Sequence, residues 1–279
     1  GGGSASSSRS QAAGSRISAN DLFITATASK TTVHEQEAIL LTYKVYTVVN
    51  LRQLYGKMPD LKGFHTQEVE LPQQKTFTLE HYKGRNYNTT VWSQYVLFPQ
   101  QTGKLEIPSI TFDGVVAQQT ISEDPFDAFF NGGGYVEVKK KITTPKVVIN
   151  VQPLPAKPAG FSGAVGEFKL ASSINATDVK TNDAVTIKLT LSGTGNMKLI
   201  GTPEVKFPQD FEIYDPKVTD DYKLTNSGLT GTKTFEYLAI PRHAGNFTIP
   251  AIEFTYFDLK SNSYKTLKTD CLLYTSDAA

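Results

Sequence analysis

The sequence predicts an all-β protein that consists of two tandem immunoglobulin-like β-sandwich domains. Three observations lead to this prediction: short stretches of alternating apolar and polar residues, Gly, Pro and Asn residues between those stretches, and an internal repeat. No long segment keeps the 3.6-residue period of an amphipathic helix. With 279 residues, 39% of them hydrophobic, the chain is long enough to bury two cores.

The repeat is clearest between residues 94–113 (QYVLFPQQTGKLEIPSITFD) and residues 236–255 (EYLAIPRHAGNFTIPAIEFT). The two segments align without a gap at an offset of 142 positions. The identical pairs are Tyr95 with Tyr237, Pro99 with Pro241, Gly103 with Gly245, Ile107 with Ile249, Pro108 with Pro250, Ile110 with Ile252, and Phe112 with Phe254. A match of this length predicts two copies of one structural unit.

The shared segment predicts a strand, a turn and then a strand that breaks. Pro99 ends the first strand because it cannot donate to a ladder, and Gly103 closes the turn. The apolar alternation of the next strand changes phase after Pro108, between Ile107 and Ile110. Such a break lets one stretch of chain contribute to both sheets of a sandwich.

The other strands are predicted from the same alternation. They are expected at residues 22–28, 39–45, 77–81, 87–98, 147–151, 168–172, 185–191 and 235–240. Gly193, Thr194 and Gly195 follow one of these strands and predict a hairpin turn. The three lysines at 139–141 predict a solvated edge strand, because edge lysines discourage pairing between sheets.

These elements divide the chain into segments. They are a flexible Gly/Ser linker at 1–17, domain one at 18–152 with an aromatic insert at 121–134, a Pro-rich linker at 153–160, domain two at 161–269, and a non-native tail at 270–279. The tail contains the single cysteine, Cys271, so no intrachain disulfide is expected. A chain that opens inside a linker is expected to be part of a longer protein.

The sequence offers little for catalysis. The histidines are His34, His65, His81 and His243. They show no metal-ligand spacing, and no nucleophile elbow, P-loop or dinucleotide motif is present. Asp215, Asp220 and Asp221 could hold calcium, although an acidic loop of this kind is more often only solvated. We therefore expect no enzymatic activity and no catalytic, cofactor-binding or metal-binding residues, and the net charge of +1 predicts no nucleic-acid partner.

The insert, ISEDPFDAFFNGGG, carries the candidate partner-binding residues Phe126, Phe129 and Phe130. Their i, i+3, i+4 spacing predicts that one helical turn brings the three rings together. Because burying each Phe is worth about 1.5–3 kcal/mol, the rings are expected to pack against something. Two interpretations stay open: a cap over the edge of their own sheet, or an aromatic anchor for a partner protein.

Several long strings of the sequence resemble a known family. They are SANDLFITATASKTTVHEQEAILLTYKVY and DPFDAFFNGG in the first half, and FSGAVGEFKL, SGTGNMKLIGTPEV, FEIYDPKV, FEYLAIPRHAGNFTIP and IEFTYFD in the second. These strings resemble BatD, the aerotolerance or oxygen-tolerance family of Bacteroides-type bacteria. The resemblance covers the chain from about residue 18 to residue 269.

The resemblance implies a protein on the periplasmic side of the cell envelope, with a signal peptide and a C-terminal membrane anchor outside this sequence. It also implies partners, because the family is encoded beside membrane-anchored von Willebrand A-domain proteins, tetratricopeptide proteins and a MoxR-type ATPase. No catalytic residues belong to the family's pattern, so none are carried over to this chain.

Two functions are therefore considered. The first is a non-enzymatic interaction or scaffold module of a membrane-anchored envelope complex linked to oxygen tolerance. The alternative is a carbohydrate- or peptidoglycan-binding module, in which exposed rings such as Trp92 or Tyr87 stack on sugars. Trp92 alternates with Gln94 and Val96, however, and this placement is more typical of a core residue.

Overall fold

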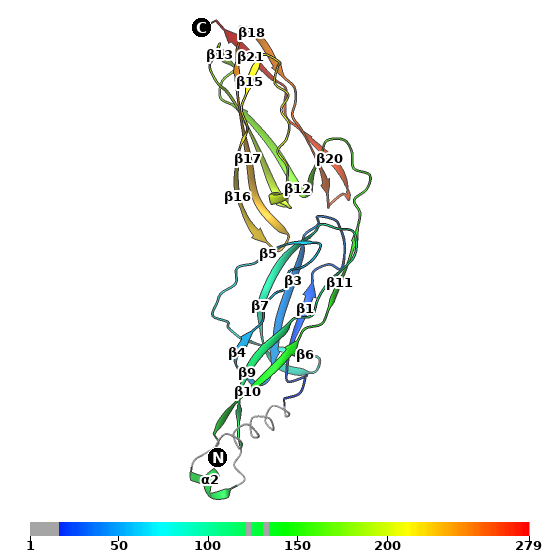
Figure 1. The fold of residues 1–279 in the computed structure, drawn as a ribbon, viewed down its shortest axis with the longest axis vertical. Coiled ribbons are helices and arrows are strands. Elements are labelled where there is room, and N and C mark those ends of the chain that lie inside the picture. The colour runs from blue at the N-terminus through cyan, green and yellow to red at the C-terminus, as the bar shows by residue number, and fades with distance from the viewer. Residues whose placement is uncertain (1–16, 121–123, 131–133, 279) are drawn as a thin grey trace. The chain divides into compact units, whose positions relative to one another are not determined.

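The computed structural model describes residues 17–120, 124–130 and 134–278 (Figure 1). The chain forms two compact units: the first holds most residues before 152, and the second holds residues from 152 onward together with 33–39 and 96–102. Residues 1–16 of the expected linker lie outside the described residues, whereas Ile17 is buried. No helix in the described part of the chain is both long and apolar enough to cross a membrane.

Strands dominate both units, which confirms the predicted all-β, tandem sandwich class. The strands before residue 153 are β1 (Leu22–Ala28), β2 (Thr32–His34), β3 (Ile39–Thr47), β4 (Asn50–Tyr55), β5 (Phe64–Glu68), β6 (Thr78–Tyr82), β7 (Arg85–Pro99), β8 (Gly103–Ile107), β9 (Thr111–Gln119), β10 (Tyr135–Thr143) and β11 (Val147–Gln152). They form a five-stranded sheet of order β1-β3-β7-β5, with β6 also paired to β7, and two three-stranded sheets, β10-β9-β4 and β2-β11-β8. A short helix, α2 (Pro125–Phe130), lies between β9 and β10.

The later strands repeat part of this arrangement. They are β12 (Phe161–Ile174), β13 (Asp178–Lys180), β14 (Val185–Gly195), β15 (Phe211–Ile213), β16 (Lys217–Thr225), β17 (Gly228–Pro241), β18 (Gly245–Ile249), β19 (Glu253–Asp258), β20 (Ser263–Lys268) and β21 (Leu272–Asp277), with a 3-10 turn η1 (Met197–Leu199). A seven-stranded sheet has the order β15-β17-β14-β12-β19-β20, with β16 also paired to β17. A three-stranded sheet, β13-β21-β18, corresponds to β2-β11-β8 in the first copy.

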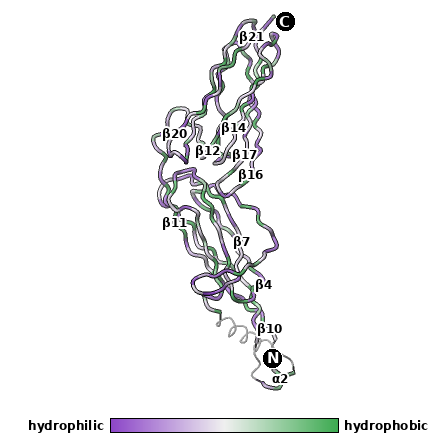
Figure 2. The backbone as a smooth tube through the Cα atoms, turned by 180° about the vertical axis from the view of Figure 1, so that it is seen from behind, coloured by the Kyte–Doolittle hydropathy of each residue, from purple (hydrophilic) through white to green (hydrophobic). Residues whose placement is uncertain are grey.

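Alternating side chains build the cores, and Figure 2 shows hydrophobic and hydrophilic residues alternating along the long strands. In the second unit, the residues of β14 that are fully buried are Val185, Ile187, Leu189 and Leu191. They pack in one cluster with Phe235 of β17 and Phe254 of β19. Burying one such side chain stabilises the fold by about 1.5–3 kcal/mol.

The predicted break after Pro108 is confirmed. Strand β8 ends at Ile107 and pairs with β11, whereas β9 begins at Thr111 and pairs with β4 and β10. In the second copy, β18 ends at Ile249 and pairs with β21, whereas β19 begins at Glu253 and pairs with β12 and β20. In both copies the chain leaves one sheet and enters another, as the change of phase predicts.

A threonine secures each break in the same way. The Oγ1 of Thr144 accepts the N–H of Ile110 at 2.8 Å, and the carbonyl of Ile110 accepts the N–H of Thr144 at 2.9 Å. Thr269 and Ile252 form the same two bonds at 2.8 and 2.9 Å. Each hydroxyl satisfies a backbone donor that has left the ladder, so the repeat extends to the hydrogen-bond pattern.

The predicted hairpin turn at Gly193 and Gly195 is wrong. Both glycines lie inside β14, which pairs with β12 on one side and β17 on the other. A Cβ on Gly193 would overlap the carbonyl oxygen of Glu167, and a Cβ on Gly195 would overlap that of Val165. Gly193 also has a φ of 150°, which side chains rarely allow. These glycines permit close approach of strands rather than a turn.

The expectation that the fold ends at residue 269 is also wrong. Leu272–Asp277 form β21, which pairs antiparallel with β18 and parallel with β13. Tyr274 of this strand is only 2% exposed, whereas Cys271 is exposed. Thus β21 takes the place that β11 takes in the first copy. The non-native origin of residues 270–279 stays a prediction.

Candidate interaction surface

The candidate partner-binding residues lie on α2, a helix of six residues. Pro125 begins the helix, where its missing N–H is not needed, and Oδ1 of Asp124 accepts the N–H of Phe126 at 3.0 Å. The loop that carries α2 is closed at its base by Thr120, whose N–H and hydroxyl donate to the carbonyl of Gly134 at 2.7 and 2.8 Å. The predicted helical turn is therefore confirmed.

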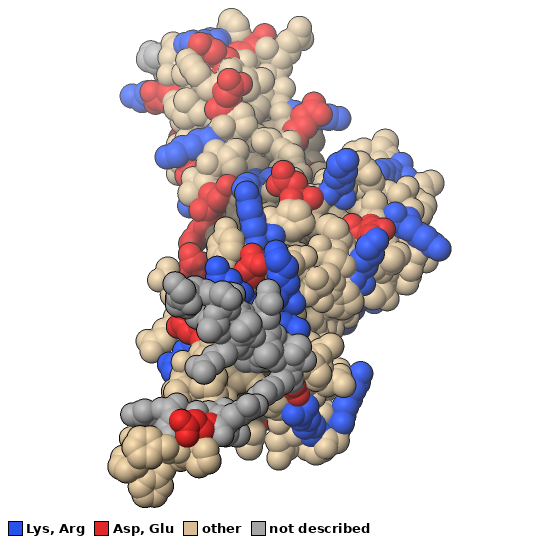
Figure 3. Space-filling model, turned by 60° about the horizontal axis from the view of Figure 1, so that its bottom comes forward, with Lys and Arg blue, Asp and Glu red and all other residues tan. Residues whose placement is uncertain are grey.

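The three rings are exposed and contact one another. Phe126, Phe129 and Phe130 are 69%, 82% and 65% exposed. The ring centroid of Phe130 lies 4.5 Å from that of Phe126 and 5.1 Å from that of Phe129. Figure 3 shows an uncharged lobe next to the grey residues, with an acidic side chain at its border. Rings this exposed do not cover the edge of their own sheet, so the cap interpretation finds no support. We call these three residues the Phe tip.

The rings considered for sugar stacking are less available than expected. Tyr87 is 5% exposed, and its ring meets those of Phe23 and Tyr46 edge to face at 5.4 and 5.9 Å. Tyr87 therefore offers no free platform. Trp92 is half-buried, and Lys75 Nζ lies 5.5 Å from its ring centroid while donating to its carbonyl at 2.7 Å.

A groove of about 830 Å³ in the first unit was not predicted from the sequence. It is lined by residues 52–55 of β4, 113–115 of β9 and 139–141 of β10, together with Trp92. The three lysines at 139–141 lie on an outer strand of the sheet β10-β9-β4, as their pattern predicted. We call this feature the basic groove.

The histidines do not assemble a site. They lie on β2, β5 and β6 and in the turn after β17. Nδ1 of His34 lies 3.5 Å from the carboxylate of Glu37, and Nδ1 of His81 lies 2.9 Å from Oδ1 of Asn86. Within the described ranges, no group of three or more His, Cys, Asp or Glu side chains could hold a metal ion.

The acidic residues considered for calcium have a different role. Asp220 and Asp221 are consecutive residues of β16, so their side chains point to opposite faces. Asp220 lies 3.3 Å from Nζ of Lys233, whose side chain is only 8% exposed. That Nζ also donates to the carbonyl of Met197 at 3.2 Å. Asp220 therefore compensates a buried cation, which would otherwise destabilise the fold.

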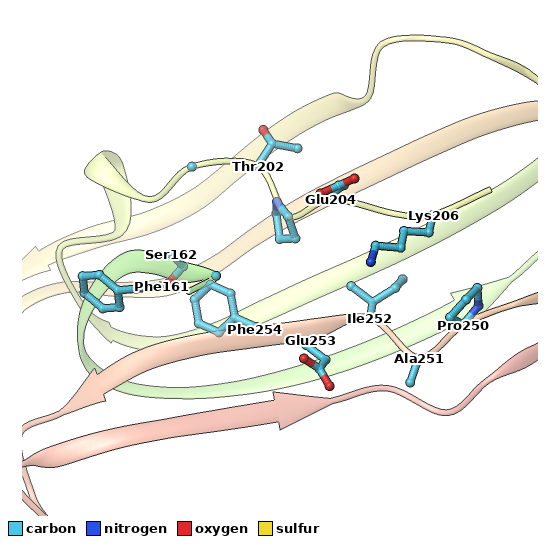
Figure 4. Close-up of a pocket in the computed structure, with 13 residues that line it drawn as sticks. Phe161, Ser162, Thr202, Glu204, Lys206, Pro250, Ala251, Ile252, Glu253 and Phe254 are labelled. Carbon is cyan, nitrogen blue, oxygen red and sulfur yellow. The ribbon is translucent and has the colours of Figure 1, made fainter. Parts of the chain in front are cut away.

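A second hollow, of about 630 Å³, lies in the second unit (Figure 4). Thr202, Pro203, Glu204 and Lys206 form one wall and residues 250–254 the other. The hydroxyl of Ser162, at one end, donates to the carbonyl of Thr255 at 2.6 Å. The described lining contains no histidine, so this hydroxyl has no imidazole base beside it.

The comparison with protein families gives one match. The model of the BatD DUF11-like domain matches residues 26–151 and 172–272, which together make up most of the chain. No curated protein matches the chain.

Solved structures with some likeness include the adhesin InvE of Yersinia pseudotuberculosis, at 10% identity and a TM-score of 0.22, covering 92% of this chain and 59% of that one. The type II cohesin dyad of the scaffoldin ScaA of Acetivibrio cellulolyticus has 9% identity and a TM-score of 0.22, covering 91% of this chain and 96% of the dyad. The Escherichia coli adhesin FdeC has 10% identity and a TM-score of 0.19, covering 93% of this chain and 65% of the adhesin. These TM-scores are too low for the likeness to carry an argument.

Proposed function

Because the chain belongs to the BatD family, we propose that it is a non-enzymatic interaction module that holds other cell-envelope proteins in place. In this proposal it works on the periplasmic side, as part of a membrane-anchored protein in a complex linked to oxygen tolerance. Its partners are the von Willebrand A-domain and tetratricopeptide envelope proteins that the family resemblance implies. The observation that carries the proposal is the exposed Phe tip.

The Phe tip leaves apolar surface in water that a partner can cover. Each Phe is worth about 1.5–3 kcal/mol when buried, so three exposed rings forgo a large share of a domain's net stability. The two bonds from Thr120 to the carbonyl of Gly134 fix the distance between the two strands from which this segment extends. A few clustered aromatic side chains that enter a pocket commonly supply most of the energy of an interface.

A protein groove fits the Phe tip better than a lipid surface does. Asp124, whose carboxylate accepts the backbone N–H of Phe126, would be repelled by anionic headgroups. A protein partner can offer hydrogen-bond donors to this carboxylate and apolar walls to the rings. The test must therefore distinguish binding to a protein from binding to a membrane.

The test is crosslinking in cells from position 130. A photo-reactive residue replaces Phe130 in the full-length membrane-anchored protein, and a matched control carries it at Leu79, which is 73% exposed on β6. We expect a discrete adduct with an envelope protein from position 130 and none from position 79. Phe129→Ser should lower the adduct yield without changing the melting temperature, because this ring is already 82% exposed.

Three results would count against the proposal. They are adducts only within the chain, adducts with lipid, and an equal yield of the same adduct from both positions. Mass spectrometry of the crosslinked species separates these outcomes.

A further inference from the structure

The basic groove is a surface separate from the Phe tip, and its residues stand in rows across the strands. Tyr55 of β4 pairs with Asp113 of β9, which pairs with Lys141 of β10. Two residues along, on the same face, Gln53 pairs with Val115, which pairs with Lys139. The row between these two, Leu54, Gly114 and Lys140, points to the opposite face of the sheet. A ligand that contacts all three strands must therefore lie across them.

The groove carries a strong excess of positive charge. Its charged lining residues are Arg52, Asp113, Lys139, Lys140 and Lys141, and of the lysines only Lys139 and Lys141 share the face of Tyr55. The carboxylate of Asp113 lies 3.4 Å from Nζ of Lys141, but these side chains are 64% and 80% exposed. An exposed ion pair of this kind is worth little, so Lys141 can exchange Asp113 for a ligand anion. The cations attract an acidic ligand and disfavour a neutral one.

Flat aromatic side chains accompany these cations. Tyr55 is 69% exposed in the same row as Lys141, and Trp92 lines the groove from β7. An aromatic ring offers a large apolar face at a small cost in conformational entropy. The combination of cations and the open ring of Tyr55 suits a ligand that has both acid groups and flat, partly apolar faces.

We propose that the basic groove binds an acidic saccharide chain, one whose sugars carry carboxylate or phosphate groups. A peptide recognised by strand addition pairs its backbone along an edge strand, parallel to the ladder. A ligand that lies across β4, β9 and β10 cannot do so, and it must be recognised through side chains alone. Sugar rings stack on Tyr55, while Arg52, Lys139 and Lys141 bind the acid groups.

The test is calorimetric titration of the whole chain with oligogalacturonate, whose sugars each carry a carboxylate. We expect a dissociation constant below about 1 mM at low salt, weakening as ionic strength rises. Arg52→Gln combined with Lys139→Gln should weaken binding by about tenfold or more. Tyr55→Ala should also weaken it, by roughly threefold or more, although it removes no charge. All three side chains are exposed, so the variants should keep the melting temperature of the parent chain.

The controls separate sugar recognition from simple attraction of charge. Lys188→Gln removes an exposed cation from β14, outside the groove, and should leave the affinity unchanged. A neutral galactan oligomer of the same length should not bind, and an oligoglutamate of the same charge should bind at least tenfold more weakly. The proposal is overturned by no binding of oligogalacturonate, by equal binding of oligoglutamate, or by an unchanged affinity in Tyr55→Ala.

Discussion

At the scale of the residue, Asp258 illustrates how a buried carboxylate can hold a hairpin. It ends β19, and its side chain is only 4% exposed. Its Oδ2 accepts the N–H of Ser261 at 3.0 Å and lies 3.0 Å from Nζ of Lys265. Burial by itself raises the pKa of this carboxyl, but the hydrogen bonds from Ser261 and Lys265 outweigh burial and lower the pKa to about 2.

This lowered pKa predicts how stability depends on pH. The folded-state pKa of Asp258, about 2, lies below its ordinary value of 3.8, so the ionised form stabilises the folded state above pH 3.8. The contribution is lost as pH falls through about 2. We expect Asp258→Asn to lower the free energy of unfolding by about 1–2 kcal/mol near neutral pH and by progressively less on acidification. Urea unfolding of both proteins at a series of pH values checks this. A difference in unfolding free energy that stays constant down to about pH 2 would contradict it.

At the scale of the element, the centre of the seven-stranded sheet depends on glycines in neighbouring strands. Gly193 of β14 pairs with Phe168 of β12 and with Gly231 of β17. Gly193 and Gly231 both have a φ of 150°, and a Cβ on either would overlap a carbonyl oxygen of the next strand. These strands can therefore approach only because the side chains are missing.

We predict that Gly193→Ala destabilises the second unit by about 2–4 kcal/mol, through backbone strain and the displacement of β12. The matched control is Gly201→Ala, since a Cβ on Gly201 meets nothing within 4 Å. The unfolding free energy of the control should stay within about 0.5 kcal/mol of that of the parent chain. Chemical denaturation followed by circular dichroism measures both variants, and equal effects at the two positions would show that the sheet accommodates a methyl group.

The same glycines explain where sequence reasoning fails for single elements. A glycine after an apolar run signals a turn, but it equally suits a strand that is approached closely, and only the pairing decides between the two. Strand β1 was predicted with both ends correct because its buried residues alternate. Strand β16 was missed because it is largely exposed and carries Asp220 and Asp221 in place of an apolar face.

The two candidate surfaces also differ in how far the sequence alone predicts them. The helical turn of the Phe tip follows from local spacing, so the sequence predicts it, but the exposure of its rings depends on the loop that carries them. The basic groove depends on pairing between residues far apart in the chain, such as Leu54 with Gly114. A run of lysines on one strand therefore cannot reveal that Tyr55 stands in the same row as Lys141.

At the scale of the whole molecule, the chain repeats one plan in which a late strand completes a small sheet. Strand β11 pairs with β8 in the first copy, and β21 pairs with β18 in the second. Tyr274 of β21 is 2% exposed, although its hydroxyl has no hydrogen-bond partner within the described part of the chain. The buried, unbonded hydroxyl of Tyr274 lowers stability, whereas burial of the apolar part of its own ring raises stability.

We predict that deleting residues 270–279 destabilises the second unit alone. The deletion leaves β18 and β13 without their shared neighbour and exposes the core around Ile249, which is 0% exposed in the whole chain. Trp92 is the single tryptophan and lies in the first unit, so its fluorescence reports on that unit, whereas calorimetry reports on both. We expect the thermal unfolding midpoint measured by Trp92 fluorescence to stay unchanged. The calorimetric transition of the second unit should shift to a temperature lower by at least about 4 °C.

Leu273→Ala is the matched control for this deletion, because Leu273 is 69% exposed on β21 and its loss leaves the ladder intact. It should shift neither transition by more than about 1–2 °C. If the deletion moves the fluorescence midpoint and the calorimetric transition together, the two units unfold as one, and the predicted boundary at 153–160 does not separate independent domains. If neither moves, the pairing of β21 with β18 and β13 adds nothing to the stability of the second unit.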